Sequence, residues 1–143
     1  MAVTRHGRIG VDVERADRVI DPRLVTLPAF FTAAESDQLA GLPERAARAR
    51  LLTLWTRKEA IGKVTGHGLS LALRGVEVSA GPSAPVALPG GGKAWLHRPV
   101  LSAPYVGALA TTRPVARIVV RSAVPWLQNN WPPRGLNTGM TLG

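Results

Sequence analysis

The chain has 143 residues, 45% of them hydrophobic, and no cysteine, which predicts one globular domain and excludes a disordered chain, a disulfide scaffold and a thiol nucleophile. No apolar run is long enough to span a bilayer and the N-terminal residues lack the apolar core typical of a signal peptide, so we expect a cytoplasmic protein without a membrane partner. The formal net charge of +9 comes from dispersed basic residues without a Lys/Arg run. This distribution argues against nucleic acid and favours acidic or phosphorylated partners.

The first predicted element is a β-strand over residues 8–14, where apolar and polar side chains alternate strictly. One face of this strand carries Ile9, Val11 and Val13, and the other carries Gly10, Asp12 and Glu14. Asp12 and Glu14 lie about 6.5–7 Å apart along such a strand. Their carboxylates can therefore converge on one hard cation. The alternative is that they belong to a solvated strand face.

Two helices are expected next. Thr32 and Glu35 match a capping box, which predicts a short helix over residues 33–41. A longer helix is predicted over residues 43–65, because a proline suits its first turn and a Gly-His-Gly sequence follows its end.

The second half of the chain changes to short strands separated by turns. Apolar and β-branched runs predict strands over residues 75–80, 94–101, 105–111 and 116–122. Residues 81–92 predict a hairpin loop whose glycine run is not a phosphate loop, because no helix follows it. We expect the domain to cover residues 1–123, followed by a tail over residues 124–143. Trp126 and Trp131 either dock this tail on the body or another subunit, or belong to a frayed terminus.

The predicted long helix carries charges on its apolar side. The apolar arc is formed by Leu51, Leu52, Leu54, Trp55 and Ile61. Lys58 falls inside this arc, Glu59 at its margin and Lys63 just beyond it, and burying such charges requires compensation by a metal ion or a phosphorylated ligand. The alternative is a Glu59–Lys63 ion pair on the helix surface with Lys58 reaching outward to solvent. His67, in the loop after the helix, either approaches a phosphate or lies exposed in a turn.

Four motifs, taken together and in this order, resemble the 4′-phosphopantetheinyl transferases, and specifically the C-terminal half of the surfactin-synthetase-activator type. They are Ile9-Gly-Val-Asp-Val-Glu14, Phe30-Phe-Thr-Ala-Ala-Glu35, Trp55-Thr-Arg-Lys-Glu-Ala-Ile-Gly-Lys63 and Gly66-His-Gly-Leu-Ser-Leu71. The resemblance covers about residues 8–111. It implies an α+β half-unit of that fold, an antiparallel sheet packed against a long helix. It also implies transfer of the phosphopantetheine arm of coenzyme A to a serine of an acyl or peptidyl carrier protein, with release of 3′,5′-ADP.

The resemblance further implies that Asp12, Glu14 and Glu59 hold Mg²⁺ and that Lys58 and Lys63 lie near the phosphates of coenzyme A. Mg²⁺ prefers oxygen ligands and substrate phosphates, and Lys63 would stabilise charge on the leaving phosphate. The serine hydroxyl must lose its proton. Glu59, directly or through a metal-bound water, is the candidate base, and Lys63 is the alternative.

The sequence departs from the family pattern at a Ser-His pair. In the surfactin-synthetase-activator type this pair lies just upstream of the first motif, where His6 here follows Arg5. Residues 101–105, which correspond to the place of the pair in the short trimeric type, also lack the histidine. The active site of the family lies between two similar halves, so we expect a homo-oligomer or a partner half-domain to complete it. The alternative is a non-catalytic half-domain or fragment that binds carrier protein or coenzyme A.

Overall fold

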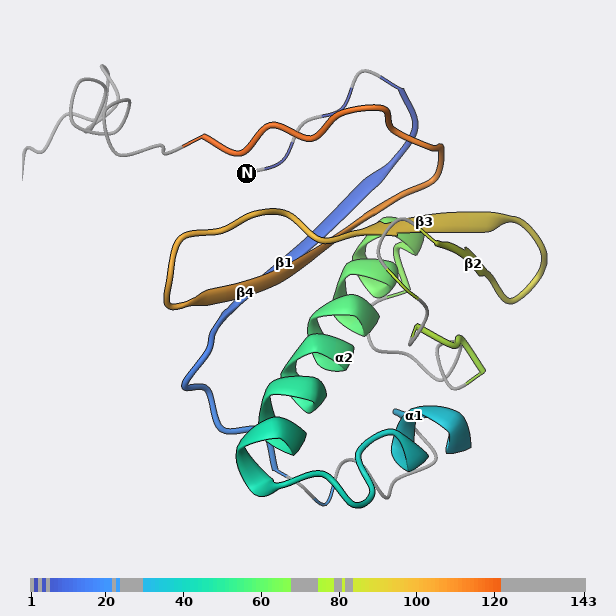
Figure 1. Ribbon diagram of the computed structural model, residues 1–143. Helices are drawn as coiled ribbons and strands as arrows, with labels where there is room; N and C mark the ends of the chain where they lie inside the picture. Colours follow the sequence, from blue (N-terminus) through green and yellow to red (C-terminus); the bar gives the residue numbers. More distant parts are fainter. Residues whose placement is uncertain are drawn as a thin grey trace, which may run out of the picture.

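One antiparallel sheet and one long helix organise the fold. The computed structural model describes residues 2, 4, 6–21, 23, 30–67, 75–78, 81 and 84–121. Its elements are β1 (Ile9–Arg15), α1 (Ala33–Asp37), α2 (Glu44–Thr65), β2 (Pro85–Ala87), β3 (Lys93–His97) and β4 (Tyr105–Thr111). The strands lie in the order β1-β4-β3-β2, and α2 packs across one face of the sheet while α1 lies away from the strands (Figure 1). The predicted α+β half-unit is confirmed.

The polar face of β1 is the face that packs against α2. Gly10 and Asp12 are buried, whereas Val13 on the opposite face is 46% exposed. On β4, the cross-strand neighbours of Gly10 and Asp12 are the buried Ala110 and Ala108. The solvated-face alternative is therefore wrong, because the carboxylate of Asp12 lies in the helix–sheet junction.

Gly10 marks the point of closest approach between β1 and α2. A Cβ atom at this position would lie 2.2 Å from the carbonyl oxygen of Ala60 and 2.5 Å from the amide nitrogen of Val64. Both atoms belong to helix backbone and cannot turn aside as a side chain can. Only glycine lets the strand approach this closely, and the close approach brings Asp12 against the helix.

We expect Gly10→Ala to lower the free energy of unfolding by about 1–3 kcal/mol, because the added carbon overpacks the helix–strand contact. Urea denaturation of the two proteins measures the difference. Gly75→Ala is the matched control, since a Cβ at Gly75 would meet nothing within 4 Å. A Gly10→Ala protein as stable as the wild type would contradict the close contact.

The start of α1 follows the predicted capping box, but its end does not follow the prediction. The Thr32 hydroxyl accepts a hydrogen bond from the Glu35 amide at 3.2 Å, and the Glu35 carboxylate accepts one from the Thr32 amide at 3.0 Å. The helix ends at Asp37 rather than near residue 41. Beyond it, the Leu39 amide donates to the carbonyl of Ser36, three residues earlier, which tightens the chain into turns.

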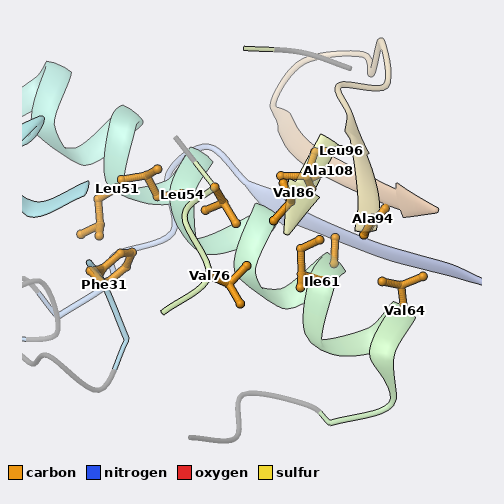
Figure 2. Close-up of a cluster of buried hydrophobic side chains, with 13 residues drawn as sticks. Phe31, Leu51, Leu54, Ile61, Val64, Val76, Val86, Ala94, Leu96 and Ala108 are labelled. Carbon is orange, nitrogen blue, oxygen red and sulfur yellow. The ribbon is translucent and has the colours of Figure 1, made fainter. Parts of the chain in front are cut away.

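α2 supplies one wall of the hydrophobic core. Like the predicted helix, it runs to Thr65 and ends at Gly66, which adopts the left-handed conformation with φ 80°. Among the described residues no helix is both long and apolar enough to cross a membrane. The core residues drawn in Figure 2 include Leu51, Leu54, Ile61 and Val64 of α2, Val86, Ala94, Leu96 and Ala108 of the sheet, and Val76.

The predictions for the second half of the chain are confirmed only in part. β4 occupies the predicted residues 105–111, whereas β3 starts at Lys93 and ends at His97, two residues before Pro99, which cannot donate to a strand ladder. β2 lies inside the predicted hairpin loop and pairs with β3, because Val86 buries its side chain in the core. The predicted tail over residues 124–143, with Trp126 and Trp131, lies outside the described residues.

Two predicted strands are wrong where the structure describes them. Residues 75–78 are not a strand, because their backbone groups bond to side chains of the helices rather than to a neighbouring strand. Residues 116–121 are also not a strand, and Val119 and Val120 within them are 54% and 50% exposed. Residues 79, 80 and 122 lie outside the described part of the chain.

Candidate functional site

An ion pair joins β1 and α2 at their junction. The ammonium of Lys63 lies 2.7 Å from Oδ1 of Asp12. Asp12 is 7% exposed, and its second oxygen, Oδ2, is buried without a hydrogen-bond partner. A buried carboxylate oxygen without a partner is costly, so this site is chemically suited to a further cation or donor.

Glu59 lies one helical turn before Lys63 and is half-buried. Burial raises the pKa of its carboxyl, and the negative charge of Asp12 raises it further, while Lys63 and Arg18 lower it. The carboxyl groups of Asp12 and Glu59 are therefore near enough to affect each other. The ion-pair partner of Lys63 is Asp12 rather than Glu59, so the alternative of a simple surface pair along the helix does not hold.

Glu14, the second carboxylate of β1, turns toward a different cation. It forms an ion pair with Arg18, and only 17% of its side chain is exposed. The guanidinium of Arg18 also lies over the ring of Trp55, 5.7 Å from its centroid. With Glu14 engaged in this way, the described residues contain no group of three carboxylates or histidines arranged to hold a metal ion.

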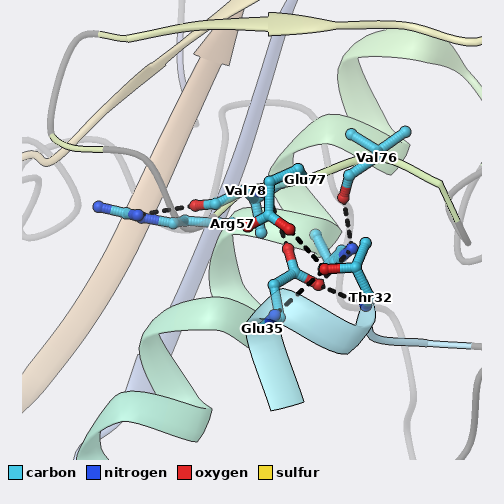
Figure 3. A network of polar contacts seen from close by, with 7 residues as sticks. Thr32, Glu35, Arg57, Val76, Glu77 and Val78 are labelled. Carbon is cyan, nitrogen blue, oxygen red and sulfur yellow. Dashed lines mark hydrogen bonds and ion pairs between the residues drawn. The ribbon is translucent and has the colours of Figure 1, made fainter. Parts of the chain in front are cut away.

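Lys58 lies in a separate buried network rather than beside Asp12. Figure 3 shows Thr32, Glu35, Val76 and Val78 of this network. Its ammonium is 2.8 Å from a carboxylate oxygen of Glu35 and donates to the carbonyl of Val76. The other oxygen of Glu35 accepts from the amide of Val78 at 2.7 Å. The side chain of Lys58 is 3% exposed, so the alternative in which it reaches outward to solvent is wrong. Glu35 compensates its charge within the fold.

The histidines do not gather at this site in the described residues. His67 is exposed directly after α2, and its backbone amide donates to the carbonyl of Gly62 at 3.1 Å. His97 lies in the sheet, where its ring is 3.2 Å from the hydroxyl of Thr111. Burial lowers the pKa of the His97 imidazole and so favours its neutral form.

The junction thus brings together the motif over residues 9–14 and the motif over residues 55–63. The motif over residues 30–35 contacts the motif over residues 55–63 through Glu35 and Lys58. A family model described as the 4′-phosphopantetheinyl transferase superfamily matches residues 8–110. The chain belongs to this superfamily. No curated protein matches the chain. The matched range extends from the residue before β1 to the penultimate residue of β4, so it includes the complete helix–sheet junction.

Sequence reasoning about this member of the superfamily did not assign Arg18 to the site. Arg18 follows β1 after a turn, where neither strand nor helix periodicity relates it to Glu14 or to Trp55. It also lines an apolar cavity of about 780 Å³. Other side chains around this cavity include Ile20, Phe31, Leu39 and Leu51. The only available signal was an arginine four residues after the acidic motif.

Proposed function

We propose that this chain transfers the 4′-phosphopantetheine arm of coenzyme A to a serine hydroxyl of an acyl or peptidyl carrier protein in a Mg²⁺-dependent reaction. Membership of the superfamily supports a transferase of this kind. The main support for placing the site here is the junction of Asp12, Glu59 and Lys63, in which a buried oxygen of Asp12 has no hydrogen-bond partner. Both proposed substrates fit the cytoplasmic location expected from the sequence.

The carboxylates at the junction suit a hard divalent cation. Asp12 offers its unpartnered oxygen, Glu59 offers a carboxyl that is close enough to feel the charge of Asp12, and Glu14 becomes available if it leaves Arg18. We propose that these three residues hold Mg²⁺. When bound, the ion would neutralise negative charge on the diphosphate of coenzyme A.

The chain's own residues would then handle the proton and the phosphate charge. The serine oxygen forms a bond to the phosphorus that carries the pantetheine, the bond from this phosphorus to the bridging oxygen breaks, and 3′,5′-ADP leaves. Glu59 is the proposed base that accepts the serine proton, because burial and Asp12 raise the pKa of its carboxyl. Lys63 is the alternative base, and its proposed main role is to stabilise charge on the leaving phosphate.

The two remaining predicted cofactor residues are placed differently. We assign Lys58 a structural role, because its ammonium is engaged by Glu35 and Val76 inside the protein. His67 is exposed directly after the C-terminal end of α2, and we retain it as a proposed phosphate contact.

We further propose that a second copy of the chain or a partner half-domain completes the site. β1, which carries Asp12 and Glu14, is an edge strand of the sheet, so another chain can approach the carboxylates from that side. Closed symmetric assemblies commonly build shared sites in this way.

A second candidate function is a non-catalytic module that binds carrier protein or coenzyme A. It is favoured by one observation: the described residues contain no group of three donors arranged for a metal ion. In this reading the Glu14–Arg18 pair would persist when ligand binds.

One experiment separates the two functions. The full chain is incubated with Mg²⁺, coenzyme A and an apo acyl carrier protein, and the carrier is weighed by mass spectrometry while calorimetry measures coenzyme A binding. We expect the carrier to gain the mass of phosphopantetheine. An unchanged carrier together with intact coenzyme A binding would overturn the transferase and support the binding module.

A further inference from the structure

We propose that Arg18 is an exchangeable counter-ion that a divalent cation displaces from Glu14, and that the displaced guanidinium then binds a phosphate oxygen of the substrate. This inference rests on the proposed function, because it takes the carboxylates of β1 as the cation site. It adds a residue and a coupling between the cation and the phosphate ligand.

Each carboxylate of β1 is paired with one basic side chain. Lys63 lies on one oxygen of Asp12, and Arg18 lies on one oxygen of Glu14. The two basic side chains therefore neutralise the charge that a divalent cation would neutralise.

The two buried polar atoms without partners among the described side chains lie beside these pairs. One is Oδ2 of Asp12, an acceptor, and the other is Nε1 of Trp55, a donor on the ring over which the guanidinium of Arg18 lies. Folded proteins rarely leave such atoms unsatisfied. Oδ2 of Asp12 could accept a bond from a cation, and Nε1 of Trp55 could donate to an anion. A ligand that contains both a metal ion and phosphate oxygens would fit these two atoms.

Arg18 can leave Glu14 without leaving the site. Its side chain is 43% exposed, so the pair with Glu14 is not locked in the core. The guanidinium also lies over the ring of Trp55, and planar guanidinium groups bind phosphate oxygens well. A cation on Glu14 would thus free a positive charge that stays close to the incoming phosphates. Cation and phosphate ligand should consequently strengthen each other's binding.

Calorimetric titrations of the full chain with Mg²⁺, and with inorganic pyrophosphate in the presence of Mg²⁺, test the exchange. Since an exposed ion pair contributes little, Arg18→Gln is expected to tighten Mg²⁺ binding by about two- to fivefold. The same substitution is expected to weaken pyrophosphate binding by about tenfold, the usual effect of losing a hydrogen bond to a charged group. Mg²⁺ should also change the tryptophan fluorescence, and Trp55→Phe should abolish that change.

Two control variants test whether the effect requires a positive charge at position 18 in particular. Arg15→Gln removes an exposed arginine that pairs locally with Asp17 and should leave both affinities unchanged. Arg18→Lys keeps the charge and should bind Mg²⁺ as the wild type does. Equal Mg²⁺ affinity for Arg18→Gln and wild type, with normal phosphopantetheine transfer, would overturn the exchange alone. A wild-type chain that binds no Mg²⁺ would overturn both the exchange and the proposed metal dependence.

Discussion

Glu59→Gln is expected to slow phosphopantetheine transfer by about 10²–10⁴-fold, the range associated with loss of a general base. The amide keeps the shape of the side chain but cannot accept the serine proton, and it is a poorer ligand for a divalent cation. Mass spectrometry of the carrier protein over time gives the rate. Circular dichroism and urea denaturation establish that the variant is folded.

Glu44→Gln is the matched control for this substitution. Glu44 lies on the same helix, and its side chain is 81% exposed and pairs with the exposed Arg48. We expect this variant to transfer phosphopantetheine at the wild-type rate. If Glu59→Gln were as active as Glu44→Gln, Glu59 could be neither the base nor a required ligand, and Lys63 would become the remaining candidate base.

Lys58→Met is expected to lower the free energy of unfolding by about 3–5 kcal/mol, because it leaves a buried carboxylate without its cation. Glu35 is fully buried, and the side chain of its ion-pair partner Lys58 is 3% exposed. The change would be measured by urea denaturation. If Lys58 instead served mainly to bind coenzyme A phosphates, the substitution would weaken coenzyme A binding with little loss of stability.

Two further variants make this result specific to the buried pair. Arg48→Met removes one partner of an exposed ion pair on the same helix and is expected to change stability by less than about 1 kcal/mol. Combining Lys58→Met with Glu35→Gln removes the unpaired charge, so the double variant should be more stable than the sum of the two single effects predicts. Strict additivity would argue against direct coupling of the two side chains.

The sequence was sufficient for the elements that obey local rules. Alternation placed β1, the capping box at Thr32 placed the start of α1, and a glycine marked the end of α2. Strand β2 was missed because three residues in a stretch rich in glycine and proline carry almost no periodic signal. Residues 75–78 were mistaken for a strand because Val76 and Val78 are buried, although side chains of the helices satisfy their backbone.

The partners of the charged residues were not predictable from spacing. Asp12 and Lys63 are 51 positions apart in the chain, and Gly10 brings them together by allowing α2 to approach β1. Lys58 and Lys63 belong to the same motif, but one pairs with Glu35 inside the protein and the other with Asp12 at the junction. A pattern of charges on one helix identifies residues that need compensation, but it does not identify which element supplies it.

The most direct test of this account compares phosphopantetheine transfer to an apo acyl carrier protein by the wild type and by Asp12→Asn, each with Mg²⁺ or with a chelator. Asp12→Asn removes the carboxylate charge at the centre of the junction while keeping its size. We expect the carrier protein to gain mass only when it is incubated with the wild-type chain in the presence of Mg²⁺. Equal mass gain with Asp12→Asn, or undiminished gain in the chelator, would contradict it.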